Sequence, residues 1–344
     1  MCKIYLLPGE INDATDYYVL IIEESFMKMS YNYKRVYSLK EIGPKDIVLT
    51  ISAKAFFLVW INRPSQFIMN WFQGIVPEEA MLLFANKPER YLRYWLWSFL
   101  EYFVLLNSRC NFFISNAMLT HYKRKYRYTK DNHFIMPCFN RKFNEKCFEE
   151  KKCTSLDFVY VGSMSAWQCI EETLALFKHI SNNIENTTLS IFTSEIAKIR
   201  MLLVKHELTS CVVKYVPYSK IDAELIKYKY GFLLRRNINI NNVSTPTKMN
   251  TYLANGVIPI FNDVISDFSE NLNSKFVIKL PEINYEDICV EKIMLIENKI
   301  DREEMKKDYE FVFSKYYSHD YYVQKLVCFL QTMLDKFMSQ KILR

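Results

Sequence analysis

Short apolar segments alternate with longer amphipathic segments along the chain. In the first part, strand-like apolar runs lie at 3–7, 46–52, 66–72, 110–115 and 133–137, with helical spacing at 14–29, 89–106 and 117–126. In the second part, strand-like runs lie at 158–161, 188–192, 212–216, 232–234, 257–261 and 275–280, with helical spacing at 167–180, 194–206 and 219–228 and three helices at the end. This alternation predicts parallel sheets with right-handed helical crossovers.

A charged segment without periodicity, residues 141–153, separates the two parts. The pattern predicts an α/β protein of two Rossmann-like domains facing a central cleft. We expect a first domain at 1–140, a linker at 141–153, a second domain at 154–318, and a terminal helix at 319–344 that packs back on the first domain. A length of 344 residues suits two cores better than one.

The segment 230–261 has the clearest local pattern in the chain. An apolar run at 232–234 predicts a buried strand that ends at Arg235 and Arg236. Thr245 is a suitable N-cap, and Pro246 then falls at the first helical position. Gly256 is placed to end this helix in the left-handed conformation. A helix start beside Lys248 and the two arginines predicts an anion-binding site, although a capped helix with solvated basic residues remains the simpler alternative.

Charge and composition narrow the class of partner. The formal net charge of +7 favours anionic partners such as nucleotides, lipid phosphates or a membrane face. Nine cysteines, without metal-ligand spacing, indicate reduced thiols and a cytoplasmic protein. No apolar stretch approaches the ~20 residues that span a bilayer. With six glycines, the chain has few positions of unrestricted backbone, so Gly74, Gly162 and Gly231 at predicted strand ends attract attention.

Several motifs resemble those of the large retaining glycosyltransferase family often called family four, whose members have the B-type fold. The stretch Ser-Thr-Pro-Thr-Lys-Met-Asn-Thr-Tyr-Leu-Ala-Asn-Gly-Val-Ile-Pro-Ile at 244–260 resembles the donor-site signature of that family. The stretch Phe-Val-Tyr-Val-Gly-Ser at 158–163 is similar to its glycine loop, and Trp-Phe-Gln-Gly-Ile-Val-Pro-Glu-Glu at 71–79 to its Gly-x-x-Pro-Glu-Glu turn. Weaker similarities lie at 113–118 and 136–140. The resemblance covers about residues 66–262 in ordered pieces.

This chain departs from the family pattern at two acidic positions. The family carries two glutamates eight residues apart, and the matching positions here are Val243 and Thr251. Asn242 and Asn250 are also eight apart, but one residue out of register. A neutral Thr251 or Asn250 would hold ribose hydroxyls more weakly than a carboxylate. Gln168 stands where the glycine-loop region of the family often has a lysine.

The resemblance implies transfer of a sugar from a UDP- or GDP-linked donor to a surface polysaccharide, lipopolysaccharide or lipid-linked acceptor, with retention. The first domain would then bind acceptor and the second the donor nucleotide. Basic side chains would stabilise the leaving diphosphate, so no cofactor or metal is expected. The expected catalytic residues are Gln73 and Glu78. The expected donor-binding residues are Gly74, Gly162, Ser163, Arg235, Arg236, Thr247, Lys248, Asn250 and Thr251.

Two surface patterns leave alternatives open. The aromatic residues between Tyr91 and Phe103 follow helical spacing, which predicts core packing or a face that leans on a membrane. The basic residues between Lys123 and Lys130 are interleaved with tyrosines, which is typical of a solvated helix end or of a site for anionic lipid. A peripheral contact at the inner face of the membrane is therefore compatible with the sequence.

Two further functions compete with glycosyl transfer. The missing glutamates favour a transferase-like protein that binds nucleotide sugar without catalysis. The net charge and the Lys/Arg–Tyr interleaving would suit a nucleic-acid-binding protein, but the sequence contains no nucleic-acid-binding motif. We therefore expect no nucleic-acid partner.

Overall fold

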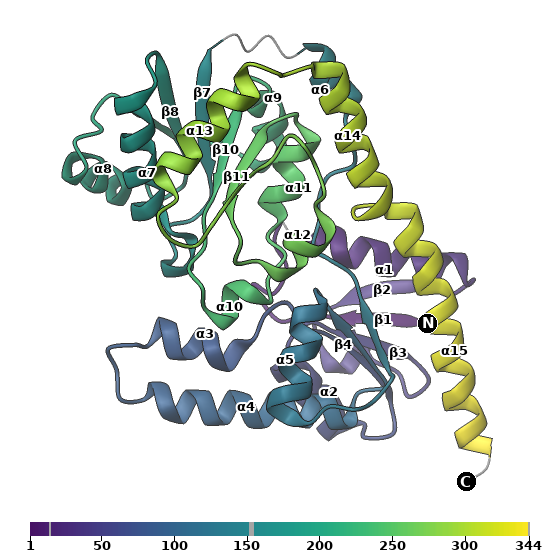
Figure 1. Ribbon diagram of the computed structural model, residues 1–344. Helices are drawn as coiled ribbons and strands as arrows, with labels where there is room; N and C mark the ends of the chain where they lie inside the picture. The colour runs from purple at the N-terminus through teal and green to yellow at the C-terminus, as the bar shows by residue number, and fades with distance from the viewer. Residues whose placement is uncertain (14, 151–154, 343–344) are drawn as a thin grey trace. The chain divides into compact units, whose positions relative to one another are not determined.

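The computed structural model describes residues 1–13, 15–150 and 155–342 (Figure 1). Its contacts divide the chain into two compact units. The first unit comprises Met1–Asn140, Val243–Thr245 and Ser318–Arg344, and the second comprises Arg141–Asn242 and Pro246–Tyr317. Each unit is built on its own sheet.

The first unit contains a six-stranded parallel sheet of order β2-β1-β3-β4-β5-β6. Its strands are β1 (Cys2–Tyr5), β2 (Tyr33–Val36), β3 (Ile47–Thr50), β4 (Phe67–Trp71), β5 (Cys110–Phe113) and β6 (His133–Ile135). The sequence pattern missed β2. This strand is the edge of the sheet and leaves Tyr33 and Lys34 exposed, so it lacks the apolar run of a central strand.

Six helices belong to the first unit: α1 (Asp16–Lys28), α2 (Ala53–Asn62), α3 (Val76–Leu83), α4 (Arg90–Asn107), α5 (Asn116–Tyr126) and α15 (His319–Ile342). The sequence pattern did not predict α2. The terminal helix α15 packs on α1, where the hydroxyl of Tyr17 lies 2.9 Å from Nδ1 of His319 and Glu24 lies 2.7 Å from its Nε2. The last helix of the chain therefore completes the first unit.

The second unit contains a parallel sheet of order β12-β11-β10-β7-β8-β9. Its strands are β7 (Leu156–Val161), β8 (Thr187–Phe192), β9 (Val212–Lys214), β10 (Tyr230–Leu233), β11 (Ile258–Asn262) and β12 (Ile278–Leu280). Counted from β7, this is the 3-2-1-4-5-6 order of dinucleotide-binding Rossmann folds. The strand order reverses between β7 and β10, and this reversal locates the crevice used by ligands in such sheets.

Nine helices accompany this sheet in the described part of the second unit: α6 (Glu145–Glu150), α7 (Ile170–Asn183), α8 (Ile196–Lys205), α9 (Ile221–Leu225), α10 (Asn239–Asn242), α11 (Thr247–Ala254), α12 (Ser266–Asn271), α13 (Glu286–Glu297) and α14 (Arg302–Lys315). Helix α6 lies inside the range 141–153 expected to be the linker, and residues 151–154 lie outside the described residues.

The predicted fold class, two Rossmann-like α/β domains, is confirmed by the two parallel sheets and their flanking helices. Within the described ranges, no helix is both long and apolar enough to cross a bilayer. In the same ranges, no three His, Cys, Asp or Glu side chains are grouped so that they could hold a metal ion.

Candidate functional site

The carboxyl ends of β7, β10 and β11 lie at one edge of the second sheet and place three residues there. Gly162 and Arg235, both predicted, come directly after β7 and two residues after the end of β10, and Asn262, which was not predicted, is the last residue of β11. Because β7 and β10 flank the reversal of strand order, this edge is where an open parallel sheet binds its ligand. Helix α11 begins at the same place with Thr247 and Lys248.

The packing of α11 explains how the helix comes so close to the strands. The large apolar side chains of α11, Met249, Tyr252 and Leu253, are all buried. The ring of Tyr252 lies against Gly231, where a Cβ would come within 2.8 Å of ring atoms. The hydroxyl of Tyr252 accepts from the amide of Val161 and donates to the carbonyl of Phe232, both at 3.2 Å. A glycine in β10 thus lets one tyrosine tie α11 to β7 and β10.

The start of α11 differs from the sequence prediction in one detail. Pro246 occupies the N-cap position, with an extended backbone, and Thr247 begins the helix. Thr245 does not cap α11. Its hydroxyl accepts instead from the amide of Cys138 within the first unit, at 2.9 Å. The prediction that Gly256 ends the helix in the left-handed conformation is confirmed by its φ of 60°.

Arg235 is a buried cation without a carboxylate partner among the described residues. Its side chain is 3% exposed. One Nη1 hydrogen bond goes to the carbonyl of the neighbouring Leu234 at 2.8 Å, and Asn262 holds the backbone amide of Arg235 at 2.8 Å. Burial lowers the pKa of Arg235, although a guanidinium keeps its proton. A buried positive charge raises the free energy of the folded protein unless an anion binds beside it.

Lys248 is the second such cation. Its ammonium donates to Oε1 of Gln168 at 2.6 Å and lies 4.3 Å from the ring centre of Tyr160. No carboxylate pairs with it in the described part of the chain. Burial, followed by repulsion from Arg235, lowers the pKa of Lys248 well below its ordinary value. The residue as a whole is half-buried, so the strong shift reflects the enclosed position of the ammonium itself.

Gly162 provides the space that the ammonium of Lys248 occupies. A Cβ built on Gly162 would lie 2.6 Å from Nζ of Lys248. The backbone φ of Gly162 is 148°, which disfavours any residue with a side chain. The loop continues to Cys169, whose φ of 52° leads directly into α7. The glycine loop, Arg235 and Lys248 together form a small, desolvated, positively charged site.

The remaining predicted donor residues differ from Arg235 and Lys248 in exposure or in the contacts that they make. Arg236 is largely exposed and forms an ion pair with Glu172 at 2.6 Å. Ser163 is exposed, with its hydroxyl 3.0 Å from that of Ser165. Thr247 is half-buried, and its carbonyl accepts from the hydroxyl of Thr251 at 3.0 Å. The charge of Arg236 is therefore already paired, whereas Arg235 and Lys248 have no carboxylate partner among the described residues.

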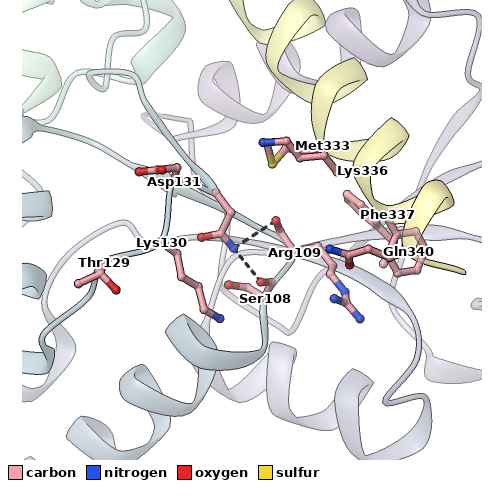
Figure 2. A pocket seen from close by; sticks show the side chains of 11 residues that line it. Ser108, Arg109, Thr129, Lys130, Asp131, Met333, Lys336, Phe337 and Gln340 are labelled. Carbon is pink, nitrogen blue, oxygen red and sulfur yellow. Dashed lines mark hydrogen bonds between the residues drawn. The ribbon is translucent and has the colours of Figure 1, made fainter. Parts of the chain in front are cut away.

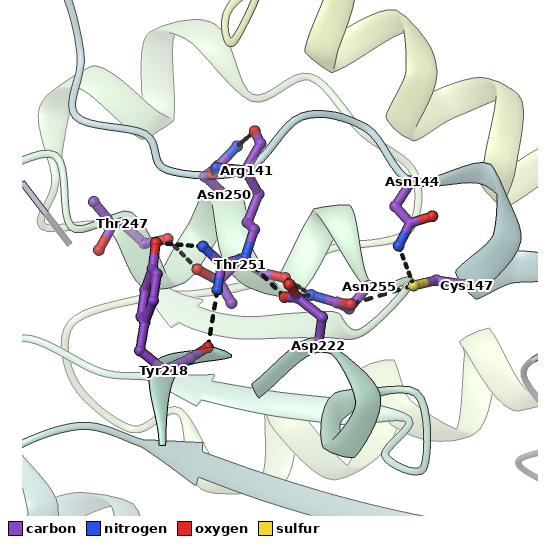
Figure 3. Close-up of polar contacts among 9 residues, drawn as sticks. All are labelled: Arg141, Asn144, Cys147, Tyr218, Asp222, Thr247, Asn250, Thr251 and Asn255. Atoms are coloured by element: carbon purple, nitrogen blue, oxygen red, sulfur yellow. Dashed lines mark hydrogen bonds and ion pairs between the residues drawn. The ribbon is translucent and has the colours of Figure 1, made fainter. Parts of the chain in front are cut away.

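Asn250 has a structural environment rather than that of a ligand contact. Its side-chain oxygen accepts from the amide of Arg141 at 2.7 Å, and its nitrogen donates to the carbonyl of Arg141 at 3.1 Å (Figure 3). Arg141 also pairs with Asp222 at 2.8 Å and stacks 4.1 Å above the ring of Tyr218. Asn250 is fully buried. This geometry argues against the predicted donor-binding role of Asn250, because ribose would have to displace the backbone of Arg141.

Asp222 joins the same set of contacts. Its carboxylate accepts from the side chain of Asn255 at 2.9 Å as well as pairing with Arg141. Figure 3 shows this polar network running from Arg141 through Asp222 and Asn255 to Cys147. The network fixes the first residues of the second unit to α9 and α11.

The predicted catalytic residues lie at the carboxyl end of β4 in the first unit. Gln73 is half-buried and donates to the carbonyl of Glu10 at 3.2 Å. Glu78 lies in the first turn of α3, 2.8 Å from Lys125 and 3.4 Å from Nε2 of His121. Burial raises the pKa of Glu78, but hydrogen bonds from His121 and Lys125 outweigh burial and leave it below the ordinary value. Glu78 is thus held as a paired anion.

Glu79, which sequence reasoning did not single out, has the opposite character. Burial and the nearby charge of Glu78 raise its pKa. The structure records no ion pair for Glu79 among the described residues, and its carboxylate covers Gly74, where a Cβ would collide with it. A carboxyl group with a raised pKa beside a glycine turn suits proton transfer better than a paired one. The Glu-Glu pair was the signal, but sequence alone did not distinguish its members.

A buried carboxyl group, that of Glu101, holds the turn that contains Gly74. Glu101 of α4 accepts from the amide of Val76 at 3.1 Å and from the hydroxyl of Tyr126 at 2.8 Å. Burial raises the pKa of Glu101 to about 8, against the opposing charge of Lys125. The hydroxyl of Tyr122 donates to the carbonyl of Gly74 at 3.3 Å. Helices α4 and α5 therefore hold the Gly74–Val76 turn in place.

A hollow of about 390 Å³ lies in the first unit (Figure 2). Arg109, Lys130 and Phe337 are among the residues that line it. It is lined by the start of β4, by the segments that precede β5 and β6, and by α15, hence at the amino ends of the strands. Lys130 donates to the carbonyl of Leu105 at 3.3 Å, where it neutralises the end of α4. The hollow therefore lies at the edge of the first sheet opposite to the carboxyl ends of its strands.

Sequence reasoning missed two residues that shape the cationic site, Tyr160 and Asn262, and it noted Gln168 only as a departure from the family pattern, not as the acceptor for Lys248. Tyr160 was hidden inside an apolar strand run, and its role depends on a helix that begins 87 residues later in the chain. Asn262 could have been suspected, because it is a polar residue at the end of a buried strand, in register beside the end of β10.

No family model matches the sequence, and no curated protein is similar to it in sequence. Solved structures are similar in fold. Sucrose-phosphate synthase from Thermosynechococcus elongatus superposes with a TM-score of 0.71 at 10% identity, over 97% of this chain and 99% of that one. WaaG, a glycosyltransferase involved in lipopolysaccharide biosynthesis, gives 0.66 at 9% identity, over 95% and 99%.

A variant of S. aureus TarM, in complex with UDP and α-GlcNAc-glycerol among other ligands, gives a TM-score of 0.63 at 13% identity. The similarity covers 84% of this chain and 56% of TarM, so the chain spans little more than half the length of that protein. The order of both sheets, the ligand edge of the second sheet and these three superpositions agree. The chain has the glycosyltransferase B-type fold of two Rossmann-like domains.

Proposed function

We propose that this protein is a nucleotide-sugar-dependent glycosyltransferase of the cytoplasm. The observation that carries the proposal is the pair of enclosed cations, Arg235 and Lys248, beside Gly162 at the ligand edge of the second sheet. Neither has a carboxylate partner in the described residues. A diphosphate would supply the missing negative charge, and the UDP bound in the TarM variant shows the kind of ligand that a protein of this fold holds.

The chemistry of sugar transfer suits such a site. When the bond between the sugar and the diphosphate breaks, negative charge grows on the leaving phosphate oxygen. Arg235 and Lys248 would stabilise this charge in an environment with little water, where each hydrogen bond to an ionised oxygen is strong. Two fixed cations supply charge of the kind that a divalent cation supplies in other sites, so we propose transfer that persists in the presence of a chelator.

The first unit would contribute the acceptor side. Glu79 and Gln73 lie at the carboxyl edge of its sheet, with the Gly74 turn between them. We propose that Glu79, rather than the paired Glu78, exchanges a proton with the acceptor hydroxyl. The acceptor would be a surface polysaccharide, a lipopolysaccharide or a lipid-linked glycan, and we propose retention of the anomeric configuration on the strength of the sequence resemblance.

The test is turnover of a panel of UDP- and GDP-linked sugars by the full chain. Release of nucleoside diphosphate that depends on Lys248 and Arg235, and that increases with a glycan acceptor, would support glycosyl transfer. Tight binding of UDP or GDP without turnover for any acceptor would favour the alternative, a nucleotide-sugar-binding protein without catalysis. The presence of Val243 and Thr251 at the two positions where the family has glutamates supports that alternative. Absence of both binding and turnover would refute the proposal.

A further inference from the structure

Helix α4 is apolar on two opposite faces, and one of them has no covering element. Ser98, Glu101, Val104 and Leu105 are buried in the first unit. The opposite side carries seven large apolar side chains that are 42–73% exposed: Tyr91, Leu92, Trp95, Leu96, Phe99, Tyr102 and Leu106. At about 100° per residue, these seven lie within an arc of ~140°. The prediction of core packing for the aromatic residues of this helix is wrong for this arc.

The exposed arc is too concentrated to be ordinary surface. Leu92 and Trp95 are 73% and 70% exposed, and Phe99 is 59% exposed. Contiguous exposed apolar patches on a single helix mark sites of association. In Figure 1, α4 lies at the edge of the first unit and is joined to α3 by a short loop, and both α3 and α2 pack on it. No element among the described residues covers the arc, which is the property expected of a docking surface.

The charges around the arc select a partner. Between Tyr91 and Leu106, α4 carries Arg93 and the buried Glu101 as its charged residues, so the arc itself has no acidic group. Lys87 and Glu89 are exposed just before the helix, and Glu89 is paired with Arg93 at 3.8 Å, which leaves the charge of Lys87 in excess there. The last turn of α5 lies against α4, through the rings of Tyr102 and Tyr126 at 5.8 Å, and exposes Lys123 and Arg124.

Such an arrangement matches an anionic lipid surface. Leucine and phenylalanine can enter the acyl boundary, tyrosine and tryptophan prefer the headgroup level, and flanking lysine and arginine meet lipid phosphates. We propose that the outer face of α4, flanked by Lys87, Lys123 and Arg124, docks the protein on a membrane that contains anionic lipids.

Docking would act on the same structural unit that holds the acceptor turn. Glu101, on the inner face of α4, accepts from the amide of Val76, and α3 begins at that residue. The docked helix thus supports the turn that contains Gly74. This last step rests on the proposed function: among the acceptors named above, it selects one that is anchored in a lipid surface.

The test is co-sedimentation of the full chain with vesicles of phosphatidylcholine, with and without phosphatidylglycerol. We expect binding that requires the anionic lipid, weakens with salt and shifts tryptophan emission to shorter wavelength. Leu92→Ser with Trp95→Ser should lower partitioning by at least about ten-fold, and Lys123→Glu with Arg124→Glu by at least about five-fold. The matched control is Met201→Ser with Val204→Ser, on α8, at 74% and 67% exposure in the parent protein.

Three results would overturn the proposal. These are no binding to anionic vesicles, equal binding by the α4 and control variants, or a dimer in solution that the α4 substitutions dissociate, which would make a second copy the covering partner. Binding of UDP and GDP to the same variants is measured in parallel. Because the α4 arc contains none of the proposed donor residues, loss of vesicle binding with intact nucleotide binding separates this proposal from the proposed function.

Discussion

Replacing Lys248 by methionine should make the protein more stable and, at the same time, poorer at binding nucleoside diphosphate. The ammonium is enclosed by Gly162, Tyr160 and Gln168, and its one recorded hydrogen bond goes to a neutral oxygen. Methionine has a similar length without the charge, so it removes the unfavourable burial of a cation next to Arg235. The same change removes a donor that a phosphate needs.

The magnitudes follow from the environment of the ammonium. Exchanging a buried charge for a well-packed apolar side chain stabilises by roughly 1–4 kcal/mol in comparable cases. At the lower end, this raises the melting temperature by about 2–4 °C for a domain of this size. Loss of one charged hydrogen bond to phosphate costs about 1.5–3 kcal/mol, so the Kd for UDP or GDP should rise about 10- to 150-fold.

The stability gain should depend on pH with a defined sign. Burial and Arg235 hold the pKa of Lys248 in the folded protein well below the ordinary value of 10.5. Between these two values the unfolded chain binds more protons, so the parent protein becomes more stable as pH rises. The penalty is complete below the folded-state pKa and disappears above the ordinary one. The advantage of Lys248→Met should therefore be largest at low pH and shrink as the solution becomes alkaline.

Thermal unfolding without ligand and calorimetric titration with UDP and GDP measure both effects on the same samples. Lys275→Met is the matched control, because Lys275 lies in the same unit, is highly exposed and pairs with Glu304. It should change neither quantity appreciably. An unchanged Kd for Lys248→Met would refute the assignment of the diphosphate site, and a lower melting temperature would refute the argument that the ammonium is an unbalanced buried charge.

Three other substitutions test separate parts of the structure. Gly162→Ala should displace the ammonium of Lys248, strain a backbone at φ 148° by about 1–3 kcal/mol and weaken nucleotide binding; normal binding in calorimetry would contradict the close approach. Glu101→Gln should reduce the loss of stability that the parent protein shows between about pH 5 and pH 8. The pKa of about 8 means that the folded protein keeps a proton that the unfolded chain loses near 4.5, so the free energy of unfolding of the parent falls by on the order of a few kcal/mol as pH rises. The same pH dependence of unfolding in parent and variant would refute the raised pKa. Asn250→Ala should lower stability by about 1–3 kcal/mol through the two lost hydrogen bonds to Arg141, with nucleotide binding retained; loss of binding in a folded variant would restore Asn250 to the donor site.

The local pattern of the sequence was sufficient for most elements and for the central cations. Strands such as Ile47–Thr50 and Ile258–Asn262 are buried on both faces, so their apolar runs identify them without tertiary information. Arg235, Gly162 and Lys248 were identifiable because the ends of parallel strands and the starts of helices are where charged or flexible residues gain a function. The edge strand Tyr33–Val36 was missed because part of it is exposed to solvent, so its sequence lacks a continuous apolar run.

Tertiary structure decided which of the candidate residues are available. Asn250 and Arg236 have the right chemistry and nearly the right position, but one is bound to the backbone of Arg141 and the other to Glu172. The difference between Glu78 and Glu79 arises in the same way, since His121 and Lys125 reach only Glu78 from α5. Sequence position sets what a side chain can do, but its neighbours from distant segments determine whether its hydrogen bonds are already used.

The same division explains the aromatic helix at Arg90–Asn107. Its sequence determined an amphipathic helix rich in aromatic residues, because the spacing of apolar side chains is a local property. Whether each face is covered depends on how many elements the fold places around the helix, and helices α2 and α3 pack on this one. The sequence therefore determined the fold class and the cations at the edge of the second sheet, while the tertiary structure decided which polar groups are already engaged and which apolar surface remains open.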